Sequence, residues 1–457
     1  MARPSYIPPQ VIVNGEVDYQ GTTEYVQPSV VALVTKVDSY LSRETSRVLG
    51  NGATAVINVK NLVESSVKLK DYSGKELVKD TDYTLAVDKA NATFSVTVIN
   101  KDIKTQALLI SYEYIPDDFF EPLKWFTLAS ITSYYGAAYN DDNTIKTPMT
   151  AAADFAFKNG ASTICIIPVY EPATKSLPSQ TIDEALDKLK LHEDIAIVVP
   201  IGFTAAELAQ VRDHIRWCEE HQLERRGIFG LDGTKTAYTV ADLTQIASTL
   251  DSEFIMFIPN TIAPVYVTDS RNSVNLPGWL YAAAVAGVAM ATPIDLSLTR
   301  HVVTGFYGTQ SYLYEEKNTL AQAGCCVIEM INGQLKIRHS VVTKQSQLLD
   351  WTFGGIYNYL MGAIRADLDP YIGKPSTDVL VSEIDADVNL FLTKQKEINY
   401  LYDFDSLEVS RRQSNPEIID VTFRCSIIRP TLWIYVTFYA RNQKRSKRRF
   451  RKNARRV

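Results

Sequence analysis

Residues 195–220 read IAIVVPIGFTAAELAQVRDHIRWCEE, and this stretch decides the fold. The continuous apolar run at 195–199 is typical of a strand that is buried on both faces. Thr204 and Glu207 follow it at the spacing of a capping box, which predicts the start of a helix. The apolar positions of that helix are Leu208, Val211, Ile215 and Cys218, which fall on one stripe. The stretch is therefore a strand, a turn and an amphipathic helix.

The same unit recurs on both sides of this stretch. We expect strands at 30–34, 164–167, 228–229 and 254–258. Helices are expected at 151–159, at 182–189 and after Thr239, which with Asp242 makes a second capping box. Strand and helix alternate four times, which predicts an α/β core with a mostly parallel sheet.

Residues 51–114 have a different pattern. Short β-type runs alternate with turns, and the last run places Leu108, Ile110, Tyr112 and Tyr114 on one face. This pattern predicts an all-β module inserted between the first strand of the α/β core and the rest of it.

The C-terminal half adds helices and further strands. Residues 278–292 form an apolar helix of fifteen residues, shorter than the roughly 20 that span a bilayer, so we expect a buried helix and no membrane insertion. Asn332-Gly333 joins two short strands as a hairpin. A long helix is expected at 345–365, and Ser376 is placed to cap another. The apolar face of that second helix consists of Val381, Ile384, Val388 and Phe391. Strands at 407–409, 418–427 and 432–439 complete an α+β C-terminal domain.

The two chain ends carry strand patterns that have no local partner. Near the N-terminus, Val11, Ile12 and Val13 lie between Pro8-Pro9 and Asn14-Gly15. In the last strand Leu432, Ile434, Val436 and Phe438 face one way, and the other face is aromatic or apolar too. Such strands pair either within their own domain or with another molecule. Sequence pattern alone leaves both alternatives open.

These patterns predict five regions. They are an N-terminal arm at 1–22, a discontinuous α/β core at 23–50 and 116–345, a β module at 51–115, a C-terminal α+β domain at 346–430, and a strand arm with a basic tail at 431–457. The fold class is an α/β core with an inserted all-β module and extended terminal strand arms.

Charge is distributed unevenly along the 457 residues. Ten of the 47 Lys and Arg residues lie in 441–457, which holds no acid, so the rest of the chain has 37 basic and 52 acidic residues and a net charge of −15. The basic tail is interpreted first as a solvated segment, then as a ligand for an acidic partner such as the next subunit, and last as a DNA contact. It has a single aromatic residue, so base stacking and a specific nucleic-acid partner are not expected.

The sequence contains only weak motifs for metal binding, nucleotide binding or catalysis. His214, Cys218 and His221 share one helix face at metal-ligand spacing, but a buried Cys beside two half-exposed histidines explains the same letters. Gly230 to Lys235 lacks the Gly-Lys pair of a P-loop. Five scattered cysteines and no apolar signal segment indicate synthesis in a reducing cytoplasm. No catalytic, cofactor-binding or metal-binding residue is predicted.

Several stretches, in this order, resemble contractile tail sheath proteins. They are PSYIPPQVIVNGEV (4–17), LPGWLYAAAVAGVAMATP (276–293), AGCCVIEMINGQLKIRHSVVT (323–343), DPYIGKPST (369–377) and IIDVTFRCSIIRPTLWIYVTFY (418–439). The basic tail departs from the family pattern.

The resemblance implies a structural subunit of a virion tail, made in the bacterial cytoplasm and acting without a cofactor. Copies would stack helically around a tail tube protein, with baseplate and tail-terminator proteins as further partners. The arms at Val11 to Val13 and Leu432 to Phe438 would add strands to adjacent subunits. Two alternatives remain: an α/β enzyme with a pocket after Ile167, Val199 or Ile258, and another component of the same kind of particle.

Overall fold

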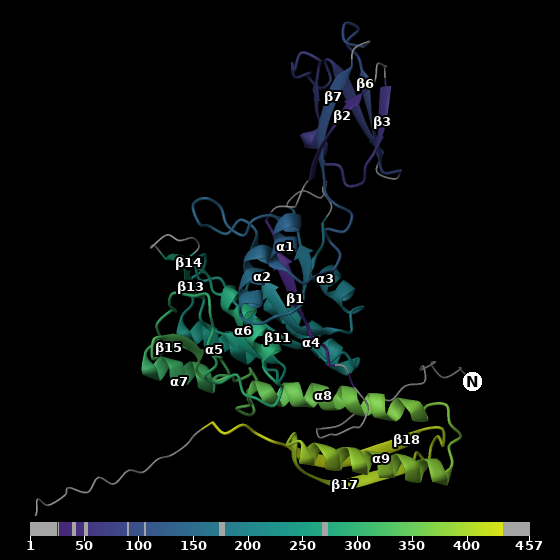
Figure 1. The fold of residues 1–457 in the computed structure, drawn as a ribbon, viewed down its shortest axis with the longest axis vertical. Coiled ribbons are helices and arrows are strands. Elements are labelled where there is room, and N and C mark those ends of the chain that lie inside the picture. The colour runs from purple at the N-terminus through teal and green to yellow at the C-terminus, as the bar shows by residue number, and fades with distance from the viewer. Residues whose placement is uncertain are drawn as a thin grey trace, which may run out of the picture.

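The computed structural model describes residues 25, 27–38, 43–49, 54–88, 91–104, 107–172, 179–266 and 273–432. Three parts follow one another along the long axis: a β module, a central α/β body, and a C-terminal unit of two long helices and a hairpin (Figure 1). The general prediction of a mixed α/β protein with several sheets is confirmed.

A six-stranded sheet, the core sheet, forms the centre of the body, in the order β12-β11-β10-β1-β9-β8. Its strands are β1 (Val30–Lys36), β8 (Leu123–Trp125), β9 (Ile164–Val169), β10 (Ile195–Ile201), β11 (Arg226–Gly230) and β12 (Ile255–Ile258). Every neighbouring pair is parallel except β8 with β9. The connecting helices are α1 (Leu128–Tyr135), α2 (Pro148–Lys158), α3 (Ile182–Leu189), α4 (Leu208–Glu220) and α5 (Val240–Leu250). The predicted mostly parallel sheet is therefore correct.

β1 shows why the core strands are apolar without interruption. Val31 and Leu33 belong to one buried cluster, together with residues of α2 and α6 (Trp279–Ala291). Ala32 and Val34 belong to a second cluster, together with residues of α3, α4 and α5. Because successive side chains point to opposite faces, helices on both sides of the sheet require apolar residues at every position.

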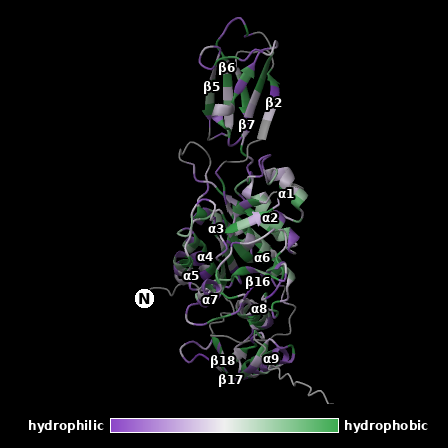
Figure 2. Ribbon diagram, turned by 90° about the vertical axis from the view of Figure 1, so that its left-hand side faces the viewer, coloured by the Kyte–Doolittle hydropathy of each residue, from purple (hydrophilic) through white to green (hydrophobic). Residues whose placement is uncertain are grey.

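The apolar helix predicted at 278–292 is α6, and it is buried. Its side chains are buried from Trp279 to Val285 and beyond, and the middle of the molecule around α2 and α6 is correspondingly apolar (Figure 2). Gly287 lets α6 approach α2 closely, since a Cβ there would lie 2.3 Å from the backbone oxygen of Ala156. Within the described ranges no helix is long and apolar enough to cross a membrane.

The β module consists of two three-stranded sheets, β2-β7-β4 and β3-β6-β5. Its strands are β2 (Arg43–Leu49), β3 (Thr54–Asn58), β4 (Lys68–Lys70), β5 (Tyr83–Asp88), β6 (Thr93–Val98) and β7 (Leu108–Tyr114). Leu108, Ile110 and Tyr112 of β7 are buried between the sheets, as their alternation predicts. The predicted start at residue 51 is too late, because β2 pairs with β7 along its whole length. Only Val48 and Leu49 of β2 are large and apolar, so its strand signal is weak. The other domain limits stay predictions.

The predicted starts of two helices, α8 and α9, need correction. α8 (Trp351–Leu368) begins six residues later than predicted, because the Asp350 side chain accepts a hydrogen bond from Thr352 N and caps the helix there. α9 (Asp378–Glu397) is capped by Thr377, whereas Ser376 donates to the backbone oxygen of Pro416.

Other local predictions are confirmed, with one exception. Thr239 and Asp242 form the capping box of α5. Glu207 accepts from the backbone N of Thr204 at 2.8 Å, but the reciprocal bond of the box is missing at α4. The Asn332-Gly333 hairpin joins β15 (Ile328–Ile331) to β16 (Gln334–Ile337), with positive φ at both turn residues. The remaining elements are β13 (Ile262–Val265), β14 (Val274–Pro277), α7 (Tyr314–Gln322) and two 3-10 turns, Glu64–Ser66 and Asp369–Tyr371.

Candidate assembly interface

The C-terminal unit consists of α8, α9 and a hairpin of β17 (Leu401–Arg411) and β18 (Ile419–Ile427). The two strands pair from Leu401↔Ile427 to Arg411↔Ile419, with an irregularity at 405–408 where Ser406 has a φ of 58°. Such a bulge increases the local twist of a strand. Among the described residues, each of these strands has the other as its sole partner. Within the described part of the chain, the outer edges of both strands therefore have main-chain donors and acceptors without a partner strand.

One face of the hairpin is apolar and the other is polar. Phe404, Leu407 and Val409 of β17 pack with residues of β18 against buried side chains of α9, such as Val388 and Phe391. The opposite face carries Tyr402, Asp405, Glu408, Ser410, Thr422, Arg424 and Ser426, all exposed. A charged outer face discourages stacking by another sheet but leaves the strand edges open to a further strand.

Of the strand predicted at 432–439, only the first residue, Leu432, is among the described residues, and it lies close to the end of this hairpin. β18 ends at Ile427, and the chain then reaches Pro430 and Leu432, which line a pocket of about 150 Å³ together with Leu349 and Phe353 at the start of α8. Leu432 is half-buried and lies outside any strand. Ile434, Val436 and Phe438 lie outside the described residues, as do Val11, Ile12 and Val13. Their pairing with neighbouring subunits stays a prediction.

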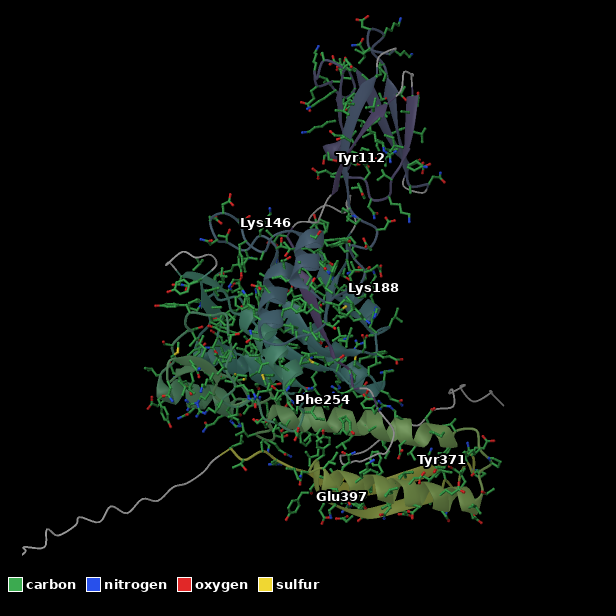
Figure 3. All side chains as sticks on the ribbon, viewed as in Figure 1. Tyr112, Lys146, Lys188, Phe254, Tyr371 and Glu397 are labelled. Carbon is green, nitrogen blue, oxygen red and sulfur yellow. The ribbon has the colours of Figure 1, made fainter. Side chains whose placement is uncertain are left out.

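α8 joins the C-terminal unit tightly to the α/β body. Three glycines, Gly354, Gly355 and Gly362, line its contact face, where Cβ atoms would lie 3.0 Å from Glu253 O, 2.9 Å from an Arg226 nitrogen and 2.2 Å from the Tyr25 ring. Phe254 lies at this junction (Figure 3) and packs on Tyr357 of α8 with the ring centroids 5.5 Å apart. The close backbone approach predicts that α8 moves as one rigid body with the α/β core.

The histidines and cysteine on α4 do not form a metal site. His214 Nε2 lies 3.1 Å from Arg225 Nη1 and 3.5 Å from Cys218 Sγ, while His221 turns away and stacks on Trp217. Burial and the nearby charge of Arg225 lower the pKa of His214 to about 3. In the part of the chain that the structure describes, no group of three His, Cys, Asp or Glu side chains is placed to hold a metal ion. The buried arginine fills the position that a cation would need, and sequence reasoning missed it because Arg225 has no signal of burial.

The carboxyl ends of the core strands are where an α/β enzyme would place its site. Asn260, just after β12, donates to Thr309 Oγ1 at 2.8 Å and to the backbone oxygen of Ile328 at 3.0 Å, and it accepts from Ile328 N at 2.9 Å. At the end of β1, Lys36 forms an ion pair with Glu207. These polar groups are therefore engaged in holding loops and strands together.

Proteins that are similar to this chain in sequence or fold come from a phage tail and from contractile particles. No family model matches the chain. Over 335 residues the chain is 27% identical to the tail sheath protein of Mycobacterium phage Bxz1, an alignment that covers 72% of this chain and 58% of the relative. The chain thus spans less than two thirds of that relative's length. The resemblance to contractile tail sheath proteins that the motifs predicted is confirmed by this similarity.

Solved structures share the fold at low identity. The sheath complex of the extracellular contractile injection system PVC in its contracted state matches with a TM-score of 0.57 and 10% identity, over 98% of this chain and all of the other. The contracted helical sheath of the anti-feeding prophage matches with a TM-score of 0.54, over 95% of this chain and 99% of that chain, also at 10% identity. A chain of the anti-feeding prophage baseplate gives 0.57 and 10%, over 96% of this chain and all of that one.

Proposed function

We propose that this chain is the structural subunit of a contractile tail sheath. Copies polymerise helically around an inner tail tube, and the sleeve shortens to drive the tube through a cell envelope. The chain is made in a bacterial cytoplasm and functions in the tail of a phage or a related particle, with no enzymatic activity and no cofactor. Its partners are other copies of itself, the tube protein, the baseplate and a tail terminator.

The observation that carries this proposal is the incomplete β17–β18 hairpin. A two-stranded sheet is marginally stable alone, and its edges are templates for added strands. The chain ends supply apolar strand-forming segments: Val11, Ile12 and Val13 at one end, and Leu432, Ile434, Val436 and Phe438 at the other. Main-chain hydrogen bonds from such segments would link each hairpin to neighbouring copies.

A linked array of this kind can change shape without breaking. The glycine-lined contact of α8 with the α/β body favours movement of the core as a unit, and strand links between units act as tethers. Contacts between different surfaces of identical copies do not close into a ring unless the rotation fits, and otherwise build a helical tube. The similarity to a phage tail sheath protein and to sheath structures supports the same conclusion.

Electron microscopy of two matched variants tests the proposal. Proline at Ile434 removes a main-chain donor and blocks strand addition, whereas threonine keeps the donor and the β-branched shape. We expect tubular polymers from the wild-type chain and from Ile434→Thr, and folded monomers from Ile434→Pro. Normal tubes from Ile434→Pro, and from a chain lacking residues 1–16, would rule out arm pairing. A wild-type chain that stays monomeric in the presence of its tube protein would argue against the sheath itself.

A further inference from the structure

Glu329 of β15 lies between three basic side chains. Its carboxylate accepts from Lys317 Nζ and Arg338 Nη1, each at 3.0 Å, and from Arg300 Nη1 at 3.3 Å. Only 9% of the Glu329 side chain is exposed, whereas the Arg300 side chain is 58% exposed. Because one negative charge faces three positive charges, this group carries a surplus positive charge that reaches the surface.

Neighbouring residues extend this group into a patch with the composition of a protein interface. Lys336 lies directly opposite Glu329 in the β15–β16 hairpin and adds a fourth cation. The Arg338 guanidinium lies 5.4 Å from the centroid of the Tyr314 ring. Arginine, tyrosine and methionine are enriched at protein interfaces. Large apolar side chains that are exposed beside these charges in the chain or in the hairpin are Val302, Leu313, Tyr314 and Met330. We name this surface the basic patch, and its cations are Arg300, Lys317, Lys336 and Arg338.

Two further acids adjoin the basic patch at the start of α7. Glu315 and Glu316 lie in the first turn of this helix, and Glu316 accepts from Leu313 N at 2.7 Å. The positive end of the helix dipole offsets part of their charge. Even with both acids counted, four cations face three carboxylates, so the patch is positive on a chain whose first 440 residues have a net charge of −15. Such a patch attracts an acidic surface.

The connection between α8 and α9 carries the opposite charge. Tyr371 lies in this connection, donates a hydrogen bond to Asp387 of α9 and has other carboxylates close by. The hydrogen bond to Asp387, together with these carboxylates, raises the pKa of Tyr371 to about 12. We name this surface the acidic tip, and its acids are Asp367, Asp369, Glu383 and Asp387.

The acidic tip is not neutralised by the described part of its own chain. Residues 366–393 contain six acids and a single Lys. Arg411 pairs with one of these acids, Asp378, so the stretch keeps four surplus negative charges. Asp369 and Glu383 are exposed, and among the described residues neither has an ion-pair partner.

The basic patch and the acidic tip lie on opposite sides of the molecule. Figure 1 shows α7 and β15 at one side of the α/β body, and Figure 3 shows Tyr371 at the end of the C-terminal unit on the other side. The two surfaces therefore do not meet within one chain. Complementary surfaces on opposite sides of identical copies make a head-to-tail contact, which repeats from copy to copy.

We propose that the basic patch of one copy binds the acidic tip of the next copy. The contact rests on the proposed function, because it joins copies in the same array, but it uses charged side chains and not the strand edges of the β17–β18 hairpin. Attraction between opposite charges acts over a longer distance than a main-chain hydrogen bond does. The contact therefore orients the incoming copy before strands pair.

Two charge-reversed variants of the full chain test this contact. The patch variant carries Arg300→Glu and Lys336→Glu, and the tip variant carries Asp369→Lys and Glu383→Lys. Each variant alone has like charges on both surfaces, so we expect its critical concentration for polymerisation at low ionic strength, measured by pelleting, to rise about tenfold. An equimolar mixture of the two should polymerise like the wild type, because every contact in it can join opposite charges.

Lys101→Glu combined with Lys104→Glu is the matched control for the patch variant. Both lysines are exposed on the β module, and the change of charge is the same. The control should polymerise at the wild-type concentration. High salt should raise the critical concentration of the wild type and bring it close to that of the two variants, because salt screens exposed charges.

The outcomes separate this contact from the proposed sheath. Normal tubes from both variants at the wild-type concentration would overturn the contact and leave the sheath intact. A wild-type chain without tubes would count against the sheath, whereas salt-sensitive association of the mixed variants in sedimentation velocity would still support the contact. A mixture that associates no better than either variant alone would overturn the contact. Loss of binding to the tube protein as the sole effect of the patch variant would also overturn it, since the patch would then serve another partner.

Discussion

The core sheet and the β17–β18 hairpin differ in how many of their strand edges and sheet faces are covered. β1 pairs with β9 on one side and β10 on the other, and buried clusters cover both of its faces. β17 pairs with β18 alone among the described residues, and one face of the hairpin is exposed. The strands of the core are therefore covered on both edges and both faces at β1, whereas the described residues leave the outer edges of the hairpin without a partner strand. Under the proposed function, rigidity belongs to the core sheet and connection between copies to the hairpin.

The largest expected effect comes from a large side chain in the core sheet. Phe229 of β11 is fully buried, so Phe229→Ala should destabilise the α/β body by about 3–5 kcal/mol. Urea denaturation monitored by circular dichroism measures this change. Phe126→Ala, at a position that is 69% exposed, is the control and should change the midpoint little. Similar midpoints for the two variants would mean that the core is not the dominant cooperative unit.

A pH-dependent effect of intermediate size belongs to the core as well. The pKa of His214 is lowered to about 3 when folded, so below about 6.5 the unfolded chain takes up a proton that the folded chain does not. Stability from this group is complete above pH 6.5 and is lost as the pH falls from there toward 3. At pH 5 the loss should be about 2 kcal/mol relative to pH 7.

The matched variant for this effect is His214→Gln, which keeps an acceptor for Arg225 but cannot be protonated. Urea midpoints at pH 7 and pH 5 should separate less in the variant than in the wild type. An unchanged separation would assign the pH dependence to other groups.

The smallest expected effect comes from replacing one valine by alanine in each of the two sheets, which compares the core sheet directly with the hairpin. Val198 of β10 is fully buried, while Val421 of β18 is half-buried. Val421→Ala should weaken the hairpin by about 1 kcal/mol, and Val198→Ala should weaken the core more, because transfer of apolar area from water scales with burial. Amide hydrogen exchange in β17 and β18 reports the first change, and exchange in β1 and β10 the second. Faster exchange of the core amides in Val421→Ala would contradict the independence of the two sheets.

The sequence predicted the parts of this molecule in which periodicity determines burial. The continuous runs at 30–34 and 195–199 are typical of strands between two layers, and Asn332-Gly333 is typical of a tight hairpin turn. The ordered motifs also identified the family resemblance that the phage relative confirms.

Sequence reasoning failed where a distant contact overrides a local signal. β2 has a polar sequence and is a strand because β7 offers it an edge. Arg225 and Arg226 are adjacent charges that pattern alone places on a surface, yet both are buried, one against His214 and the other against Trp351. The burial of Arg226 depends on Trp351 of α8, which lies 125 residues later in the chain.

The way the β module enters and leaves the body makes it a replaceable cassette. Arg43 and Tyr114 are directly opposite each other in the β2–β7 pair, so the two connections emerge about 5 Å apart. A domain with neighbouring ends can be exchanged at such a point with little change in loop-closure entropy. A foreign domain with similarly close ends should be accepted there without disturbing β1 or the core sheet. In the proposed assembly, one graft per subunit would repeat on every copy and make the particle a regular display scaffold.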